Sequence, residues 1–260
     1  MRLLSYLIDR QPRYGALSGD GVIDLSRRIG QKFPDLRTLI ERDGLAEARA
    51  AIAGQKPDYA LADLTLLPPI PQPEKLWCIG VNYKDRNAEY KDGSDLPKYP
   101  SLFVRNSESI VGSGQPIEMP KISDQLDYEG ELVLVIGKAG RHISRENAWQ
   151  HIFGMTLCNE GSVRDWLHHG KFNVTQGKNF DRSGSIGPWI VTADEIADPN
   201  NLAINSYDGD ELVFEDSTAN LVFPVERVIA HASNYMTLEA GDILHCGTAM
   251  KPREGGKYRA

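Results

Sequence analysis

The chain has 260 residues, of which 41% are hydrophobic and 25% charged, a composition typical of a globular protein with a sizeable core and not of a disordered chain. Its formal net charge of −7 and its scattered basic residues argue against a nucleic-acid-binding groove. The three cysteines, Cys78, Cys158 and Cys246, lie far apart without CxxC spacing, which argues against disulfides and a thiolate metal site and favours a reducing cytoplasm.

The first 67 residues predict a small N-terminal α/β domain. Two stretches, 2–9 and 13–26, alternate in the manner of short strands, and Gly19–Gly21 supply a hairpin turn within the second. Two helical patterns follow, and each ends in a glycine suited to a helix C-cap, Gly44 and Gly54.

A proline-rich segment, 68–73, predicts an extended linker, because proline fixes φ and removes a backbone donor. We therefore expect a second, larger domain over 74–260. Its apolar patterns predict helices at 144–154 and 223–238, and strands at 75–81, 100–106, 131–137, 187–192, 201–209, 211–216 and 242–248. The fold class is α+β, mainly β. Apolar runs such as LVLVI are far shorter than a membrane span, so no membrane partner is expected.

Glu129 and Glu131 lie two residues apart at the start of a strand pattern, so they share a face with Val133 and Val135. Two carboxylates roughly 6 to 7 Å apart on such a strand repel each other and lose hydration unless a cation compensates. A solvated strand end is the commoner explanation of the pair alone. A third carboxylate, Glu160, favours an octahedral oxygen site for Mg²⁺ or Mn²⁺ over a zinc site.

Five motifs, in this order along the chain, resemble the fumarylacetoacetate hydrolase family. They read GVNYKDRNAE (80–89), DYEGEL (127–132), NEGSVRD (159–165), GKNFD (177–181) and GDILHCGTA (241–249). The resemblance implies a mixed β-roll catalytic domain, a smaller N-terminal domain and an assembly of subunits, for which we expect a homodimer. It also implies a Mg²⁺ or Mn²⁺ ion held by three carboxylates, which map onto Glu129, Glu131 and Glu160.

The chain departs from the family pattern in three places. Glu160 stands where relatives usually have aspartate, one methylene shorter. The histidine of NYxxHxxE is Arg86, although Glu89 is kept; in hydrolytic members the histidine and glutamate activate water, and an arginine cannot act as a base. The GTP turn reads GTA at 247–249, and the chain stops at Ala260, where relatives continue into further strands. We expect metal binding to survive, while water activation loses its base.

Three basic residues are candidates for substrate contacts. We expect Lys178, in GKNFD, to contact the substrate carboxylate or enolate, although a solvated loop lysine is the alternative. Arg105 and Arg164 could clamp carboxylates bidentately, and Arg164 could equally pair with Asp165 or a metal ligand. The predicted substrate-binding set is completed by members of the first and last motifs, Tyr83 and Thr248.

Residues 82–93 predict a short helix that could cover the metal as a lid. In this hypothesis Arg86 binds the distal carboxylate of a diacid substrate, while Glu89 moves a proton or orients water. The alternative is an exposed ion pair between them. His168 and His169 are further candidates for the absent base, although loop residues are the simpler interpretation.

Three functions remain open from the sequence. The first is hydrolysis of a 2,4-dioxo acid, an acylpyruvate such as fumarylpyruvate or maleylpyruvate, to pyruvate and a carboxylic acid through a metal-stabilised enolate. The second is isomerisation or decarboxylation of a 2-hydroxy-dienoate diacid in aromatic catabolism, which needs no activated water and is favoured by Arg86. The third is a non-catalytic protein that binds a metal or an oxo acid.

Overall fold

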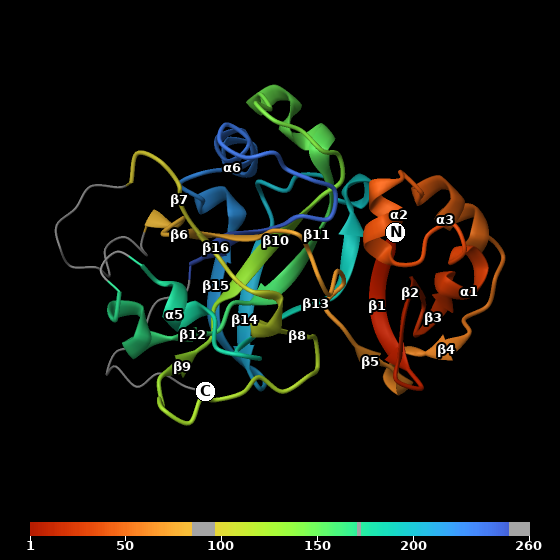
Figure 1. Ribbon diagram of the computed structural model, residues 1–260, viewed down its shortest axis with the longest axis horizontal. Helices are drawn as coiled ribbons and strands as arrows, with labels where there is room; N and C mark the ends of the chain where they lie inside the picture. Colours follow the sequence, from red (N-terminus) through yellow and green to blue (C-terminus); the bar gives the residue numbers. More distant parts are fainter. Residues whose placement is uncertain (85–96, 171–172, 250–260) are drawn as a thin grey trace.

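The computed structural model describes residues 1–84, 97–170 and 173–249. The fold is α+β and mainly β, as predicted, and is built on one mixed sheet of twelve strands (Figure 1). The strands of the chain are β1 (Arg2–Ile8), β2 (Gln11–Ser18), β3 (Gly21–Asp24), β4 (Tyr59–Ala60), β5 (Thr65–Leu66), β6 (Leu76–Gly80), β7 (Ser101–Val104), β8 (Ile110–Gly112), β9 (Leu126–Asp127), β10 (Gly130–Ile136), β11 (Ile152–Asn159), β12 (Ser162–Val163), β13 (Gly184–Thr192), β14 (Ala203–Asp208), β15 (Glu211–Ser217) and β16 (Ile243–Thr248).

The helices are short, and several are single 3₁₀ turns. The α-helices are α1 (Leu25–Ile29), α2 (Leu36–Glu41), α3 (Leu45–Ile52), α5 (Thr175–Lys178) and α6 (Val225–Ala232). The 3₁₀ helices are η1 (Leu61–Asp63), η2 (Ser107–Ser109), η3 (Arg145–His151), η4 (Arg164–His168), η5 (Ala193–Glu195) and η6 (Thr218–Asn220). Among the helices described, none combines the length and the apolarity needed to cross a membrane.

The sheet runs in the order β4-β3-β2-β1-β13-β11-β10-β16-β6-β7, with β5 on β1 and β8 on β13. Strand β10 lies in its interior, and its side chains alternate between two cores, as the period of a strand requires. Val133 and Val135 face a core that extends into the N-terminal part, while Leu132, Leu134 and Ile136 face a core covered by α6. Both faces of this strand are therefore buried.

The N-terminal strands continue the large sheet. Strand β1 pairs with β13, with Leu3 opposite Ile190, and Figure 1 shows the red strands of the N-terminus beside β13. Residues 68–73 contain no helix or strand, as expected of a proline-rich linker. The division into two domains at this linker stays a prediction.

Two local expectations differ from the structure. The pattern at 144–154 predicted one helix, but it forms η3 and then enters β11, because the apolar residues from Ile152 onward alternate as on a strand. Gly44 does not take the left-handed conformation that ends α2; Asp43 does, with φ 51°. The amide of Gly44 donates to the carbonyl of Leu39 at 2.8 Å, the outer bond of a Schellman motif.

Candidate metal and substrate site

The pairing of β10 with β11 brings the three predicted carboxylates together. Gly130 lies opposite Asn159, so Glu129 and Glu160 meet just beyond the ends of the two strands, where the Glu160 amide donates to the Glu129 carbonyl at 2.8 Å. One carboxylate oxygen from each of Glu129, Glu131 and Glu160 lies within 4.8 Å of the others. The structure thus places these three side chains together, and their role as metal ligands stays a prediction.

Glu131 is held by the backbone of the last described strand. Its Oε2 accepts a hydrogen bond from the Gly247 amide at 2.9 Å. Gly247 has φ +90°, and a Cβ at this position would lie 2.8 Å from the Cβ of Asn82, so only glycine fits without strain. The register of β10 with β16 shifts at this point, and the resulting bulge directs the amide at the carboxylate.

Two buried cations contact the carboxylates. Nζ of Lys178, at the end of α5, lies 2.6 Å from Oε2 of Glu129 and 2.9 Å from Oε2 of Glu160. Nη1 of Arg164, at the start of η4, lies 2.6 Å from Oε1 of Glu129, and its Nη2 lies 2.9 Å from Oδ2 of Asp127. Of the two partners expected for Arg164, the structure shows the metal-ligand candidate Glu129, while Asp165 accepts a hydrogen bond from Ser123.

The electrostatics of the cluster favour an added cation. The site gathers four buried carboxylates, those of Asp127, Glu129, Glu131 and Glu160. The structure shows the two cations just described in contact with three of them. Burial and the charges of Glu160 and Glu129 raise the pKa of Glu131 well above its usual value. The site is thus short of positive charge, and a divalent cation would supply it.

Lys178 is a charged group at this site despite its burial. Burial alone would lower the pKa of its ammonium, but the carboxylates of Glu129 and Glu160 outweigh burial and raise that pKa. The same contact, together with His245, holds the pKa of Glu160 well below its usual value although burial opposes it. The solvated loop lysine allowed by the sequence is not what the structure shows.

The cluster forms the floor of a cavity of about 110 Å³. Thr248 lines this cavity, in keeping with its place in the predicted substrate-binding set, and its Oγ1 donates to the Gly130 carbonyl at 3.1 Å. The ring of Phe103 lies on another wall, 5.3 Å from Nζ of Lys178. At about 30 Å³ per water molecule, the described cavity has room for roughly four waters or a short oxo acid.

Two residues of the predicted substrate-binding set lie away from this cavity lining. Arg105 is buried, and its guanidinium donates to Ser109, Gly161 and Ser183, so it ties three segments of the chain together. Tyr83 is 2% exposed and packs in a small apolar cluster with residues of the β15 region. In the described structure both side chains support the fold around the site.

The predicted lid lies outside the described residues. Arg86 and Glu89, the two residues expected to bind the distal carboxylate and to move a proton, fall in the segment 85–96, and the side chain of His168 is likewise not described. His169 is exposed, its ring centroid lies 4.2 Å from that of Trp166, and it is not among the residues that line the cavity of the carboxylates.

The structure adds residues for which the sequence analysis predicted no role. His245 is fully buried on β16, with Nδ1 3.2 Å from Oε1 of Glu160 and 3.5 Å from Sγ of Cys158. Burial lowers the pKa of His245, which favours the neutral ring. Asp127 is the second such residue, and its carboxylate accepts a hydrogen bond from Nε of Arg164. Strand alternation in DILHCGT, which places His245 on the same face as Gly247, is the one signal that pointed to this histidine.

Comparison with known proteins places this geometry in a family. The family model for the C-terminal domain of fumarylacetoacetate hydrolase matches residues 75–258, which contain every residue of the cluster. The chain belongs to the fumarylacetoacetate hydrolase family. The resemblance inferred from the five motifs is thereby confirmed.

Relatives within the fumarylacetoacetate hydrolase family carry several activities. The mitochondrial oxaloacetate tautomerase fahd2 of Xenopus laevis is 38% identical over 244 residues, 91% of this chain and 75% of the relative. The oxaloacetate tautomerase YisK of Bacillus subtilis is 37% identical over 193 residues, 73% of this chain and 64% of the relative. The maleylpyruvate hydrolase of Sphingobium sp. SYK-6, solved with manganese(II) and pyruvate, has a TM-score of 0.79 and 30% identity over 95% of this chain and 88% of its own.

The residues of this family member fit a hard divalent cation. Glu129, Glu131 and Glu160 offer only oxygen donors, the donor type that Mg²⁺ and Mn²⁺ prefer. The excess negative charge of the cluster and the raised pKa of Glu131 are both relieved by a cation at this point. Glu160, one methylene longer than the usual aspartate, still reaches the other two carboxylates.

Proposed function

We propose that this chain is a divalent-metal-dependent enzyme that interconverts the keto and enol forms of a small 2-oxo acid, with oxaloacetate as the first substrate to test. The observation that carries the proposal is the cluster of three buried carboxylates with Lys178 at the floor of one small cavity. The names of the tautomerases that align with most of this chain support the choice of reaction.

The reaction moves one proton and creates negative charge on one oxygen. A proton leaves C3 of the oxo acid, charge collects on the 2-oxygen as an enolate, and protonation of that oxygen gives the enol. A divalent cation held by Glu129, Glu131 and Glu160 would act as a Lewis acid that stabilises this charge. The Lys178 ammonium, charged and buried beside the same carboxylates, supplies a second positive group within the cavity.

The remaining chain residues hold these groups in place. Arg164 fixes one oxygen of Glu129, and Asp127 fixes Arg164, so the carboxylate cannot turn away from the cavity. Glu89 is our candidate for the group that removes the C3 proton, and Arg86 for the group that binds the distal carboxylate. These two roles rest on the motif GVNYKDRNAE.

Hydrolysis of an acylpyruvate such as maleylpyruvate or fumarylpyruvate is the second candidate. The similarity to maleylpyruvate hydrolase favours it, and the enolate that forms after C3–C4 cleavage needs the same stabilisation. It also needs an activated water, and Arg86 replaces the histidine that would serve as base. Isomerisation or decarboxylation of a dienoate diacid needs no such water and remains a variant of the first candidate.

The deciding experiment incubates the protein and Mg²⁺ with oxaloacetate, two acylpyruvates and a dienoate diacid. We expect accelerated loss of the enol absorbance of oxaloacetate, relative to buffer with Mg²⁺, and no pyruvate released from acylpyruvates by mass analysis. Fast pyruvate release without tautomerisation would favour hydrolysis. Turnover of no compound, with binding of oxo acids, would favour a non-catalytic binding protein.

Three further predictions accompany this function. We expect Mg²⁺ as the physiological ion, with Mn²⁺ as a functional substitute, because both accept the all-oxygen donor set. A homodimer and a cytoplasmic location also remain predictions.

A further inference from the structure

A second set of metal-binding atoms lies behind the three carboxylates. Sγ of Cys158, a ring nitrogen of His245 and a carboxylate oxygen of Glu131 all lie within 4.8 Å of one another. Cys158 is opposite Glu131 in the pairing of β10 with β11, and His245 comes from β16 on the other side of β10. Three adjacent strands therefore bring one sulfur, one nitrogen and one oxygen donor to a single point.

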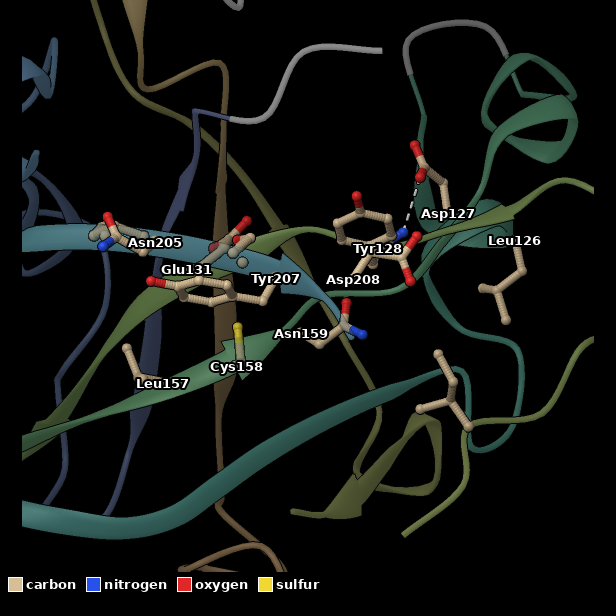
Figure 2. A pocket seen from close by; sticks show the side chains of 14 residues that line it. Leu126, Asp127, Tyr128, Glu131, Leu157, Cys158, Asn159, Asn205, Tyr207 and Asp208 are labelled. Atoms are coloured by element: carbon tan, nitrogen blue, oxygen red, sulfur yellow. Dashed lines mark hydrogen bonds between the residues drawn. The ribbon is translucent and has the colours of Figure 1, made fainter. Parts of the chain in front are cut away.

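This second set opens toward a different cavity from the first. A cavity of about 710 Å³ lies between β11 and β14, and both Glu131 and Cys158 line it. Figure 2 shows Cys158 on β11 and Glu131 among the side chains around this cavity. The three-carboxylate set instead faces the smaller cavity with Lys178. Glu131 is the residue that lines both.

We propose that Glu131, Cys158 and His245 form a site for one thiophilic divalent cation, such as Zn²⁺, Co²⁺ or Cd²⁺. Tetrahedral coordination with metal–sulfur bonds of about 2.3 Å and metal–nitrogen bonds of about 2.0 to 2.1 Å requires a sulfur–nitrogen separation of roughly 3.6 Å. The separation between Sγ of Cys158 and Nδ1 of His245 is 3.5 Å. The donors therefore need little movement to bind a metal.

In the neutral ring, Nδ1 of His245 donates its proton to Oε1 of Glu160 at 3.2 Å, while Nε2 makes no hydrogen bond among the described residues. Coordination of a metal through Nδ1 therefore requires the other tautomer, with the proton on Nε2. When a cation binds, the thiol of Cys158 transfers its proton to water as the metal–sulfur bond forms. The Nδ1 proton of His245 moves through water to Nε2, so that Nδ1 supplies its electron pair to the metal. The negative charge of the carboxylate cluster attracts the cation.

The proposed site for a thiophilic cation goes beyond the proposed reaction. It shares Glu131 with the three-carboxylate site, so binding of one class of metal affects binding of the other. Glu131 cannot give the same oxygen geometry to a hard cation on one side and a thiophilic cation on the other. Occupation by Zn²⁺ should therefore weaken binding of Mn²⁺ at the three-carboxylate site. This predicts that traces of a thiophilic metal inhibit the protein while Mg²⁺ and Mn²⁺ do not.

The test is a Co²⁺ titration of the metal-free protein followed by absorption. A Co²⁺–thiolate bond gives a charge-transfer band in the near ultraviolet that oxygen ligands alone do not give. We expect the band in the wild type, its loss in Cys158→Ser, and its retention in the matched control Cys246→Ser, which removes a buried thiol outside the site. No band in the wild type, a band that persists in Cys158→Ser, or one that instead depends on Cys78 would overturn the proposal.

Mn²⁺ binding, measured by electron paramagnetic resonance, separates this proposal from the proposed function. Cys158→Ser should bind Mn²⁺ as the wild type does, which also shows that it folds; if it does not fold, His245→Gln should weaken Co²⁺ binding by at least about tenfold. One equivalent of Zn²⁺ should weaken Mn²⁺ binding to the wild type, and unchanged Mn²⁺ binding would contradict the shared role of Glu131. Absent Mn²⁺ binding with an intact Co²⁺ band would overturn the three-carboxylate site alone.

Discussion

Glu131 has the least favourable charge environment of the described carboxylates at the site. It is 2% exposed, it faces Glu129 and Glu160, and its one backbone donor is the Gly247 amide. A protein retains such a group when a cation stabilises it, because an uncompensated buried charge costs several kcal/mol. The neighbouring Lys178 and Arg164 are committed to Glu129 and Glu160, which leaves Glu131 as the carboxylate that depends most on an added ion.

Lys178→Met tests whether the ammonium stabilises the developing charge. We expect kcat for oxaloacetate tautomerisation to fall by about 10²- to 10³-fold, the range found when one charge-stabilising donor is removed. Mn²⁺ affinity should not weaken, because the change removes a cation that competes for Glu129 and Glu160. Steady-state kinetics and Mn²⁺ titration measure the two effects. Lys138→Met, at an exposed lysine, is the control, and a wild-type kcat in Lys178→Met would refute the role.

Arg86→His tests whether the missing base explains a lack of hydrolysis. Restoring a group that can accept a proton should raise the rate of acylpyruvate hydrolysis by at least about tenfold, toward the range of general-base catalysis. Pyruvate release is the measurement. If hydrolysis does not rise, the replacement at position 86 is not what separates this chain from hydrolytic relatives.

At the residue scale, sequence reasoning found the carboxylates and missed their neighbours. Glu129, Glu131 and Glu160 were recognisable because they fall in ordered motifs, and strand spacing explains the first two. Cys158 and His245 are 87 residues apart, and no local spacing indicates that β10 lies between their strands. Arg105 fitted a carboxylate clamp equally well in sequence, and only its contacts with Ser109 and Ser183 show its structural role.

At the scale of elements, β10 contributes side chains to two cores and also carries Glu131 of the candidate site. The side chains of the run LVLVI pack alternately into two cores, and this packing holds the strand in place. The same packing holds the backbone of Glu131, which lies near the start of the strand. The alternation of apolar residues predicted this strand and most others. Helix α1 was not predicted, because five residues are too few to show a helical period.

The contact of Asp58 with Arg28 joins the segment before β4 to α1, and its pH dependence can be predicted. Oδ2 of Asp58 lies 2.5 Å from Nη1 of Arg28 and accepts from the amide of Asp24 at 2.8 Å. The bond from Arg28 outweighs burial and lowers the pKa of Asp58 below its ordinary 3.8. The stabilisation is therefore complete above the unfolded pKa and disappears as the pH falls through the folded pKa.

Asp58→Asn should lower the free energy of unfolding by about 1 kcal/mol at pH 7, a value reduced by partial solvent screening. As the pH falls through the folded pKa of Asp58, which lies below 3.8, the variant and the wild type should converge, because the wild-type carboxylate becomes protonated there. Urea unfolding at several pH values measures both. Asp20→Asn, in an exposed hairpin turn, should change stability by no more than about 0.5 kcal/mol. A deficit in Asp58→Asn that is equally large at low pH would contradict the assignment.

At the scale of the whole molecule, one core joins the N-terminal part to the site. Leu3, Phe33 and Leu39 pack in the same buried cluster as Val133 and Ile190. The sequence predicted a small N-terminal part and a larger, strand-rich part on either side of the proline-rich segment 68–73. It could not predict that β1 pairs with β13, since nearly two hundred residues separate them and edge pairing has no local signal.

Removal of residues 1–73 should therefore leave a fragment that does not fold cooperatively. The fragment 74–260 loses the strand that pairs with β13 and exposes the apolar side chains that face the N-terminal part. Calorimetry should show one cooperative transition for the full chain and none for the fragment. A fragment that unfolds cooperatively and binds Mn²⁺ would show instead that the catalytic part is independent.

The most direct test of the central claim is a Mn²⁺ titration followed by electron paramagnetic resonance. The wild type should bind one Mn²⁺ per chain, and Glu131→Gln should lose this binding together with activity. Glu118→Gln, which removes an exposed carboxylate paired with Arg182, should bind Mn²⁺ as the wild type does. An unchanged titration in Glu131→Gln would contradict the three-carboxylate metal site.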